Sequence, residues 1–228
     1  NCVKCTRLTS ISAMPKLKEL NCLHCTALTA IPIMGELKKL YCEGCKALTA
    51  IPVMAKLEKL NCLNCVSLTA IPVLPKLEEL NCLFCNITSI SALPKLEVLY
   101  CSDCTRLTSI HDLPKVRTLS CTNCTALTSI FAVPKLRDLF CINCTVLTTI
   151  PKELSTLICL HCKWIDKCRD FDSNIKSLRS CQAIFKRKLT AKKLEKLLPS
   201  IIEIYYSPGC KGENIAYRSF LKRVPKTE

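Results

Sequence analysis

The chain has 228 residues, of which 49% are hydrophobic and only 5% aromatic, so any core that it builds is aliphatic and rich in its 21 cysteines. Its formal net charge of +15 favours acidic proteins, nucleic acids or anionic membranes as partners without selecting one. No run of eighteen apolar residues occurs and the first residues lack the layout of a secretory signal, so we expect a soluble protein with no membrane association.

From the first residues onward, cysteine pairs with the spacing Cys-x-x-Cys divide residues 1–162 into short units. The first cysteines of successive pairs stand mostly 20 residues apart, with one step of 19 and a last step of 18. Such a period predicts a solenoid, in which each unit buries its apolar side against the next. Because the sequence begins without Met and in mid-repeat, we expect that a cap or a further domain can precede residue 1. The pairs are Cys2/Cys5, Cys22/Cys25, Cys42/Cys45, Cys62/Cys65, Cys82/Cys85, Cys101/Cys104, Cys121/Cys124, Cys141/Cys144 and Cys159/Cys162.

Each unit contains one predicted strand. Leu20 and Cys22 alternate with Glu19, Asn21 and Leu23, a period of two that directs the first two inward and the others to an open face. We therefore expect about eight parallel strands, roughly 4.8 Å apart, in one concave sheet. Recurrent prolines after each strand leave no room for a long helix, so the convex side should be extended or form single turns.

The unit Leu-x-x-Leu-x-Cys-x-x-Cys-x-x-Leu-Thr-x-Ile-Pro resembles the leucine-rich repeat, with cysteine at the third Leu and at the Asn/Cys position. Its short length resembles the bacterial-effector class of these repeats, and its Cys-x-x-Cys and Ile-Pro features resemble repeat arrays encoded by large DNA viruses of amoebae. The resemblance implies a leucine-rich-repeat solenoid with a parallel β-sheet on its concave face and an extended or 3-10 convex side. It also implies a non-catalytic scaffold or adaptor for protein–protein interaction.

The cysteines permit three interpretations. Two thiolates three residues apart could share a zinc ion with a second pair, and stacked equivalents could form disulfides. Packing is favoured, because Cys22 takes an inward strand position and Cys25 a position whose side chain serves the turn backbone. Since 21 is an odd count and free thiols persist in reducing compartments, we expect an intracellular protein in the cytoplasm or nucleus, of the host cell if it is viral.

No catalytic constellation is predicted. The three histidines, His24, His111 and His161, take different places in the repeat, so the register assembles no Cys-His-Asp group and we expect isolated surface histidines. The sequence has only 4 glycines and shows neither a phosphate-binding glycine loop nor paired carboxylates. We expect no enzyme activity, no catalytic residue, no cofactor and no metal. The recurrent threonine of the Leu-Thr step should form a column of hydroxyls that bind turn backbones.

Variable outward residues mark the predicted binding face. Large apolar and aromatic side chains are more frequent there than solubility requires, and such side chains often anchor protein partners. The alternative is that they are scattered, tolerated apolar residues. The partner and the oligomeric state are not predicted. The predicted partner-binding residues are Tyr41, Leu63, Leu83, Phe84, Tyr100, Phe140 and Ile142.

The period is lost after Trp164. We predict that residues 1–165 form the solenoid and that residues 166–228 form a small basic α-helical cap, whose apolar stripe seals the open end. A dense basic strip in this segment gives an alternative function, sequence-independent DNA or RNA binding, although a solvated basic face would look the same. The predicted nucleic-acid residues are Lys186, Arg187, Lys188, Lys192, Lys193 and Lys196.

Overall fold

The computed structural model describes residues 1–110, 112–130, 132–147, 151, 154–158 and 162. All of them lie in the first of the two units of the chain, Asn1–Lys167. The predicted solenoid boundary at residue 165 and the predicted helical cap over residues 166–228 lie outside the described residues, and they stay predictions.

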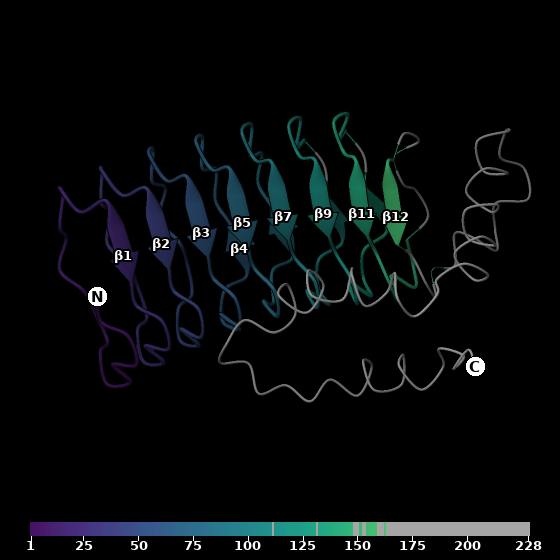
Figure 1. Cartoon of the computed structure of the whole chain (residues 1–228). Helices are drawn as coiled ribbons and strands as arrows, with labels where there is room; N and C mark the ends of the chain where they lie inside the picture. Colours follow the sequence, from purple (N-terminus) through teal and green to yellow (C-terminus); the bar gives the residue numbers. More distant parts are fainter. Residues whose placement is uncertain (111, 131, 148–150, 152–153, 159–161, 163–228) are drawn as a thin grey trace, which may run out of the picture. The chain divides into compact units, whose positions relative to one another are not determined.

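Eight short parallel strands form the main sheet, one from each successive unit (Figure 1). Their spatial order is β1-β2-β3-β5-β7-β9-β11-β12, so each unit pairs only with the units before and after it. The register is strict, because Leu20 lies opposite Leu40 and Leu40 opposite Leu60, and the same leucine position continues through the sheet. The strands are β1 (Glu19–Asn21), β2 (Lys39–Tyr41), β3 (Lys59–Asn61), β5 (Glu79–Asn81), β7 (Val98–Tyr100), β9 (Thr118–Ser120), β11 (Asp138–Phe140) and β12 (Thr156–Ile158).

Two further pairs of strands form as the chain leaves the turn after each main strand. β4 (Ala70–Ile71) pairs in parallel with β6 (Ser89–Ile90), and β8 (Ser109–Ile110) pairs in parallel with β10 (Ser129–Ile130). The described part of the chain contains no helix, hence none that is long and apolar enough to cross a membrane. The prediction of a solenoid of roughly 20-residue repeats with a parallel sheet and extended return segments is therefore confirmed.

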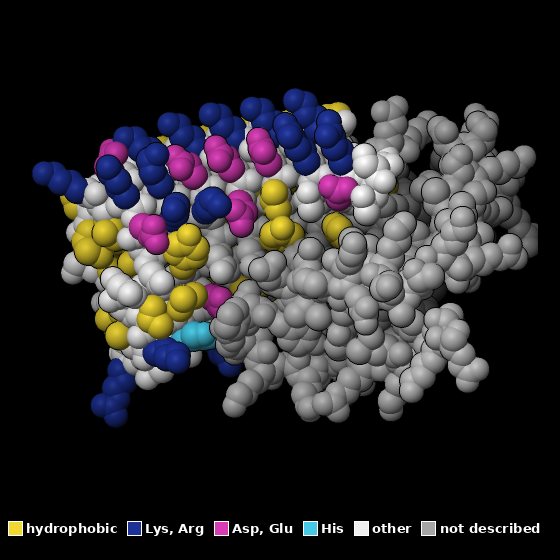
Figure 2. All heavy atoms as spheres, in the orientation of Figure 1, with side chains coloured by type: hydrophobic (Ala, Val, Ile, Leu, Met, Phe, Trp, Pro, Cys, Tyr) yellow, Lys and Arg dark blue, Asp and Glu magenta, His cyan; other side chains and the backbone are white. Residues whose placement is uncertain are grey.

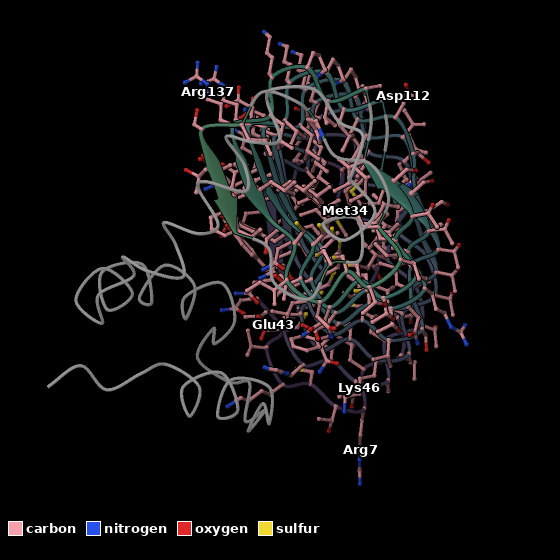
Figure 3. All side chains as sticks on the ribbon, turned by 90° about the vertical axis from the view of Figure 1, so that its right-hand side faces the viewer. Arg7, Met34, Glu43, Lys46, Asp112 and Arg137 are labelled. Carbon is pink, nitrogen blue, oxygen red and sulfur yellow. The ribbon has the colours of Figure 1, made fainter. Side chains whose placement is uncertain are left out.

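The core consists of columns of equivalent side chains from successive units. The central leucine of the first seven strands of the main sheet, such as Leu40, is buried. Leu48, Met54 and Leu57, which follow Leu40 along the chain, are buried as well. Figure 3 shows Met34, the equivalent of Met54, in the interior of the cross-section. One unit alone could not bury these side chains, so neighbouring units stabilise one another by stacking.

The Cys-x-x-Cys turn has a conserved geometry along the chain. Its third residue adopts a left-handed backbone, with φ between 57° and 69° at Gly44, Asn64, Phe84 and Asp103, among others. Its amide donates to a carbonyl of the next unit, as from Gly44 to Leu63 at 2.8 Å. Asn, Asp and Gly tolerate this conformation, whereas Phe84 holds it at a steric cost.

Candidate partner-binding face of the sheet

Three columns of side chains form the outward face of the main sheet, which we call the sheet face. The rim column comes from the residue just before each strand, and the first column from the first strand residue. The third column comes from the last strand residue, and it carries the aromatic side chains. Figure 2 views this face and shows charged side chains along its upper part with hydrophobic side chains below them. The third column consists of Asn21, Tyr41, Asn61, Asn81, Tyr100, Ser120 and Phe140.

The third column contains residues whose side chains bond the turn and residues whose side chains do not. The side-chain oxygens of Asn21, Asn61 and Asn81 accept hydrogen bonds from the amide two residues later, at 3.2 to 3.3 Å. Tyr41 and Phe140 stand at the same position, half-buried, and have no side-chain oxygen placed to make that bond. An aromatic ring is therefore not required here by the fold.

The prediction of an outward side chain was wrong for Leu63 and Leu83, which are each only 1% exposed. Strand β3 ends at Asn61 and strand β5 at Asn81, so the alternation with a period of two does not extend to these leucines. The turn directs their side chains into the interior, where they cannot contact a partner. Sequence alternation gave no sign of this, because it does not show where a strand ends.

The other predicted partner residues are half-buried. Tyr41, Tyr100 and Phe140 lie together in the third column of the sheet face, whereas Phe84 and Ile142 lie in the Cys-x-x-Cys turns beyond the strand ends. The structure thus brings three of the seven predicted residues into one column and separates two others from it. The positions of these residues do not by themselves show that they bind a partner.

Complementary charges join neighbouring units along the rim and first columns. Lys38 Nζ lies 2.8 Å from a Glu58 carboxylate oxygen, and Lys59 Nζ lies 2.7 Å from a Glu79 carboxylate oxygen. These ion pairs lower the pKa of Glu58 and raise the pKa of Lys38 and Lys59. Because the groups are solvated, each pair contributes little to stability.

The turn after β2 contains a buried carboxylate that sequence analysis did not single out. Glu43 is only 6% exposed and its Oε1 atom has no hydrogen-bond partner. Burial raises the pKa of Glu43, while the charge of His24 and the Asn61 side chain act in the opposite direction. The sequence contains a sign of this residue, because several other units carry Leu, Ser or Thr where this unit carries a glutamate. The residues at the position equivalent to Glu43 in those units are Leu63, Leu83, Ser102 and Thr122.

A half-buried carboxylate, Asp103, occupies the left-handed position of a later turn. Asp103 accepts a hydrogen bond from Asn123 Nδ2 at 2.9 Å, and Asn123 accepts one from Asn143 at 3.2 Å. The Oδ2 atom of Asp103 has no partner, and burial raises its pKa. These side chains form a polar column at the turn end of the solenoid, where Figure 3 also shows Glu43.

The cysteine pairs pack inside the solenoid. Fifteen of the described cysteines are buried, which confirms the packing interpretation for them; Cys2 is half-buried and Cys5 exposed. Within the described residues no group of three or more His, Cys, Asp or Glu side chains could hold a metal ion. The neighbouring thiol of Cys65, followed by burial, raises the pKa of Cys42 well above its ordinary value.

The predictions for the threonine column, the histidines and the basic strip differ in how they compare with the structure. Thr29 and Thr128 each donate a hydroxyl hydrogen bond to the backbone of the equivalent threonine one unit earlier, which confirms the threonine column in these units. His24 is half-buried beside Gly44 and within electrostatic reach of Glu43, so it is not an isolated surface histidine. His111 and His161 lie outside the described residues, as does the predicted basic strip of Lys186, Arg187, Lys188, Lys192, Lys193 and Lys196.

Comparison with known proteins agrees with this geometry over two units. No curated protein and no solved structure matches the chain. Residues 75–115, which include β5, β7 and their return segments, match the family described as Leucine Rich repeats (2 copies). The strict register extends the same unit over both sides of that match. The described chain is thus a solenoid of short repeats, two of which are recognised as leucine-rich repeats.

Proposed function

We propose that this solenoid is a non-catalytic scaffold that binds a partner protein on its sheet face. Leucine-rich-repeat solenoids are generally scaffolds for protein–protein interaction, and two units of this chain match that family. Fold alone does not select the binding surface, so the proposal depends on the residues of the sheet face.

One observation carries the choice of surface. In the third column, large aromatic side chains stand at positions where the fold is equally served by Asn or Ser, as at Asn61 and Ser120. Aromatic residues bring large contact areas to interfaces at low entropic cost, and they dominate binding hot spots. Tyr41, Tyr100 and Phe140 are therefore the proposed contact residues.

The rest of the sheet face has the composition of an interface rim. Exposed charged residues of both signs line the rim and first columns, beside the aromatic column (Figure 2). Apolar anchors with a polar, solvated border are the usual arrangement in protein–protein interfaces. A sheet of eight strands at about 4.8 Å also gives a length of roughly 35 Å, which suits a polypeptide better than a metabolite.

A matched pair of variants tests the surface. The full chain carrying Tyr41→Glu and Phe140→Glu is compared with a chain carrying Val53→Glu and Val73→Glu, which are 57% and 50% exposed on the return segments. Both variants introduce two carboxylates, and circular dichroism checks that both remain folded. Proteins retained from extract of the source cells by the wild type and the valine variant should be lost from the aromatic variant. Equal retention by the two variants would refute the sheet face as the binding surface.

Several expectations stay predictions. These are the intracellular location, the likeness to effector or viral repeats, and nucleic-acid binding by the basic segment. A mobility-shift titration with duplex DNA at low and moderate salt tests the last of these, because phosphate contacts weaken steeply with salt.

A further inference from the structure

A basic pocket lies just before β11, the seventh strand of the main sheet. Arg117, Lys135 and Arg137 line a pocket of about 530 Å³ together with Pro134, Leu136, Leu154 and Ser155. The three cationic residues are exposed, and Figure 3 shows Arg137 extending away from the solenoid. We call these residues the basic pocket.

Backbone hydrogen bonds fix the two arginines one strand spacing apart. The Arg137 amide donates to the Arg117 carbonyl at 2.9 Å, and the Ser155 amide donates to the Arg137 carbonyl at 2.8 Å. Arg117, Arg137 and Ser155 are thus consecutive members of the rim column. Like charges that lie directly opposite each other on adjacent strands are destabilising, and nothing in the packing of the leucine core requires arginine at both positions.

In earlier units, several lysines are paired with glutamates. Lys38, Lys56 and Lys59 each form an ion pair with a glutamate of a neighbouring unit, at 2.6 to 2.8 Å. Among the described residues, no such pair forms at Arg117, Lys135 or Arg137. A column of lysines with the register of Lys56 continues beside them, and Figure 2 shows dark-blue side chains along this border. Its further members are Lys76, Lys95, Lys115 and Lys135.

The lining of the pocket favours carboxylates on a polypeptide. Two guanidinium groups can each bind a carboxylate or a phosphate through two parallel hydrogen bonds. Pro134 and Leu154 add apolar surface for a peptide, whereas the lining includes no aromatic ring on which a base could stack. A second copy of the chain is disfavoured as the occupant, because each copy has a net charge of +15.

We propose that the basic pocket binds an acidic segment of a partner protein, with Arg117 and Arg137 binding its carboxylates and Lys135 closing the border. The proposal rests on the proposed function and deepens it, since it assigns a chemical class to one part of the partner. The ligand carboxylates would replace, at this unit, the glutamates that neutralise cations in the earlier units.

A fluorescent hexaglutamate peptide probes the pocket in the full chain. Its affinity is measured for the wild type, for Arg117→Gln with Arg137→Gln, and for Lys16→Gln with Lys18→Gln, which removes the same charge from exposed positions at the other end of these columns. Charge-assisted hydrogen bonds predict a loss of about tenfold or more for the arginine variant and less than about twofold for the lysine variant. Equal losses in both variants, or no loss in either, would overturn the proposal.

A second readout locates the peptide directly. Carbodiimide coupling joins a carboxylate to a lysine amine that it contacts, so peptide adducts should form at Lys135 and decrease in the arginine variant. Adducts found only at lysines other than Lys115 and Lys135 would also overturn the proposal. Lysines of the basic segment after residue 166 count among these other lysines.

Further probes separate the alternatives. Tighter binding of single-stranded oligothymidylate than of hexaglutamate, lost in the arginine variant, would show a phosphate site and overturn the acidic peptide. Sedimentation of the wild type as a concentration-dependent dimer that the arginine variant abolishes would show a second copy instead. If the aromatic variant retains its partners while hexaglutamate binds at Lys135 and is lost in the arginine variant, the sheet-face proposal fails and the pocket proposal stands.

Discussion

The thiol of Cys45 donates a hydrogen bond to the carbonyl oxygen of Cys22, one unit earlier, with a distance of 3.1 Å between the sulfur and the oxygen. Equivalent bonds join Cys65 to Cys42 and Cys85 to Cys62, each at 3.0 Å. Each of these carbonyls also accepts a hydrogen bond from an amide of its own turn, as Cys22 does from Cys25 at 3.3 Å. The thiol therefore adds a second hydrogen bond, one that joins neighbouring units of the stack.

Replacing Cys65 by Ala tests this role. The change removes the thiol donor and leaves the Cys42 carbonyl with only the Cys45 amide. One intramolecular hydrogen bond contributes about 0.5 to 1.5 kcal/mol, so the free energy of unfolding should fall by about that amount. Urea unfolding followed by circular dichroism measures the difference. Cys65→Ser keeps a donor and should lose less; equal losses for Ala and Ser would contradict the hydrogen-bonding role.

Native-state alkylation should separate the described cysteines by burial. Cys5 is exposed, whereas Cys42, Cys62, Cys82 and Cys101 are buried and each has a pKa raised well above its ordinary value by a neighbouring thiol and by burial. Because the thiolate is the reactive form, iodoacetamide at neutral pH should modify Cys5 first. Peptide mapping by mass spectrometry after short labelling measures this order. Labelling of Cys62 as fast as Cys5 would show that the thiols are not enclosed.

Glu43→Leu should stabilise the protein at neutral pH. The substitution removes a buried carboxylate with an unpaired oxygen and introduces the residue found at the equivalent Leu63 and Leu83, so we expect a gain of about 1 to 3 kcal/mol. Thermal or urea unfolding at pH 7 measures it. Destabilisation would contradict the packing described for this turn.

The same residue gives a pH dependence of known sign. Because burial raises the pKa of Glu43, the folded chain binds this proton more tightly than the unfolded chain. Its contribution to stability is therefore present below the ordinary value of 4.5 and is lost as pH rises through the higher folded pKa. The difference in stability between Glu43→Leu and the wild type should grow as pH rises from about 4 to 7. A difference that shrinks over this range would show the opposite shift.

Gly44 and His24 should behave as a coupled pair. A methyl group at Gly44 would overlap His24 Nδ1, and Gly44 has a left-handed backbone with φ of 69°. Gly44→Ala should therefore destabilise the chain by about 1 to 3 kcal/mol, the range for a strained backbone position. Combining it with His24→Ala should recover the part due to overlap, and a double-mutant cycle by urea unfolding measures that coupling. Strict additivity would show that the backbone conformation alone is responsible.

The sequence predicted the period, the parallel register and the buried cysteines, because each follows from side-chain spacing repeated along the chain. It misplaced Leu63 and Leu83, since the strands end two residues before each of them and alternation does not show where a strand stops. The basic pocket was also missed. Its residues lie in different units, and only the register shows that Arg117 and Arg137 are neighbours without glutamates between them.

Site-specific photo-cross-linking tests most directly whether the sheet face is the binding surface. A benzophenone amino acid is placed at Phe140 on the sheet face or at Val53 on the return segments, and each full-length protein is irradiated in extract of the source cells. We expect a discrete cross-linked partner from position 140, competed by unlabelled wild type, and none from position 53. Competed cross-links from position 53 with none from position 140 would contradict the account.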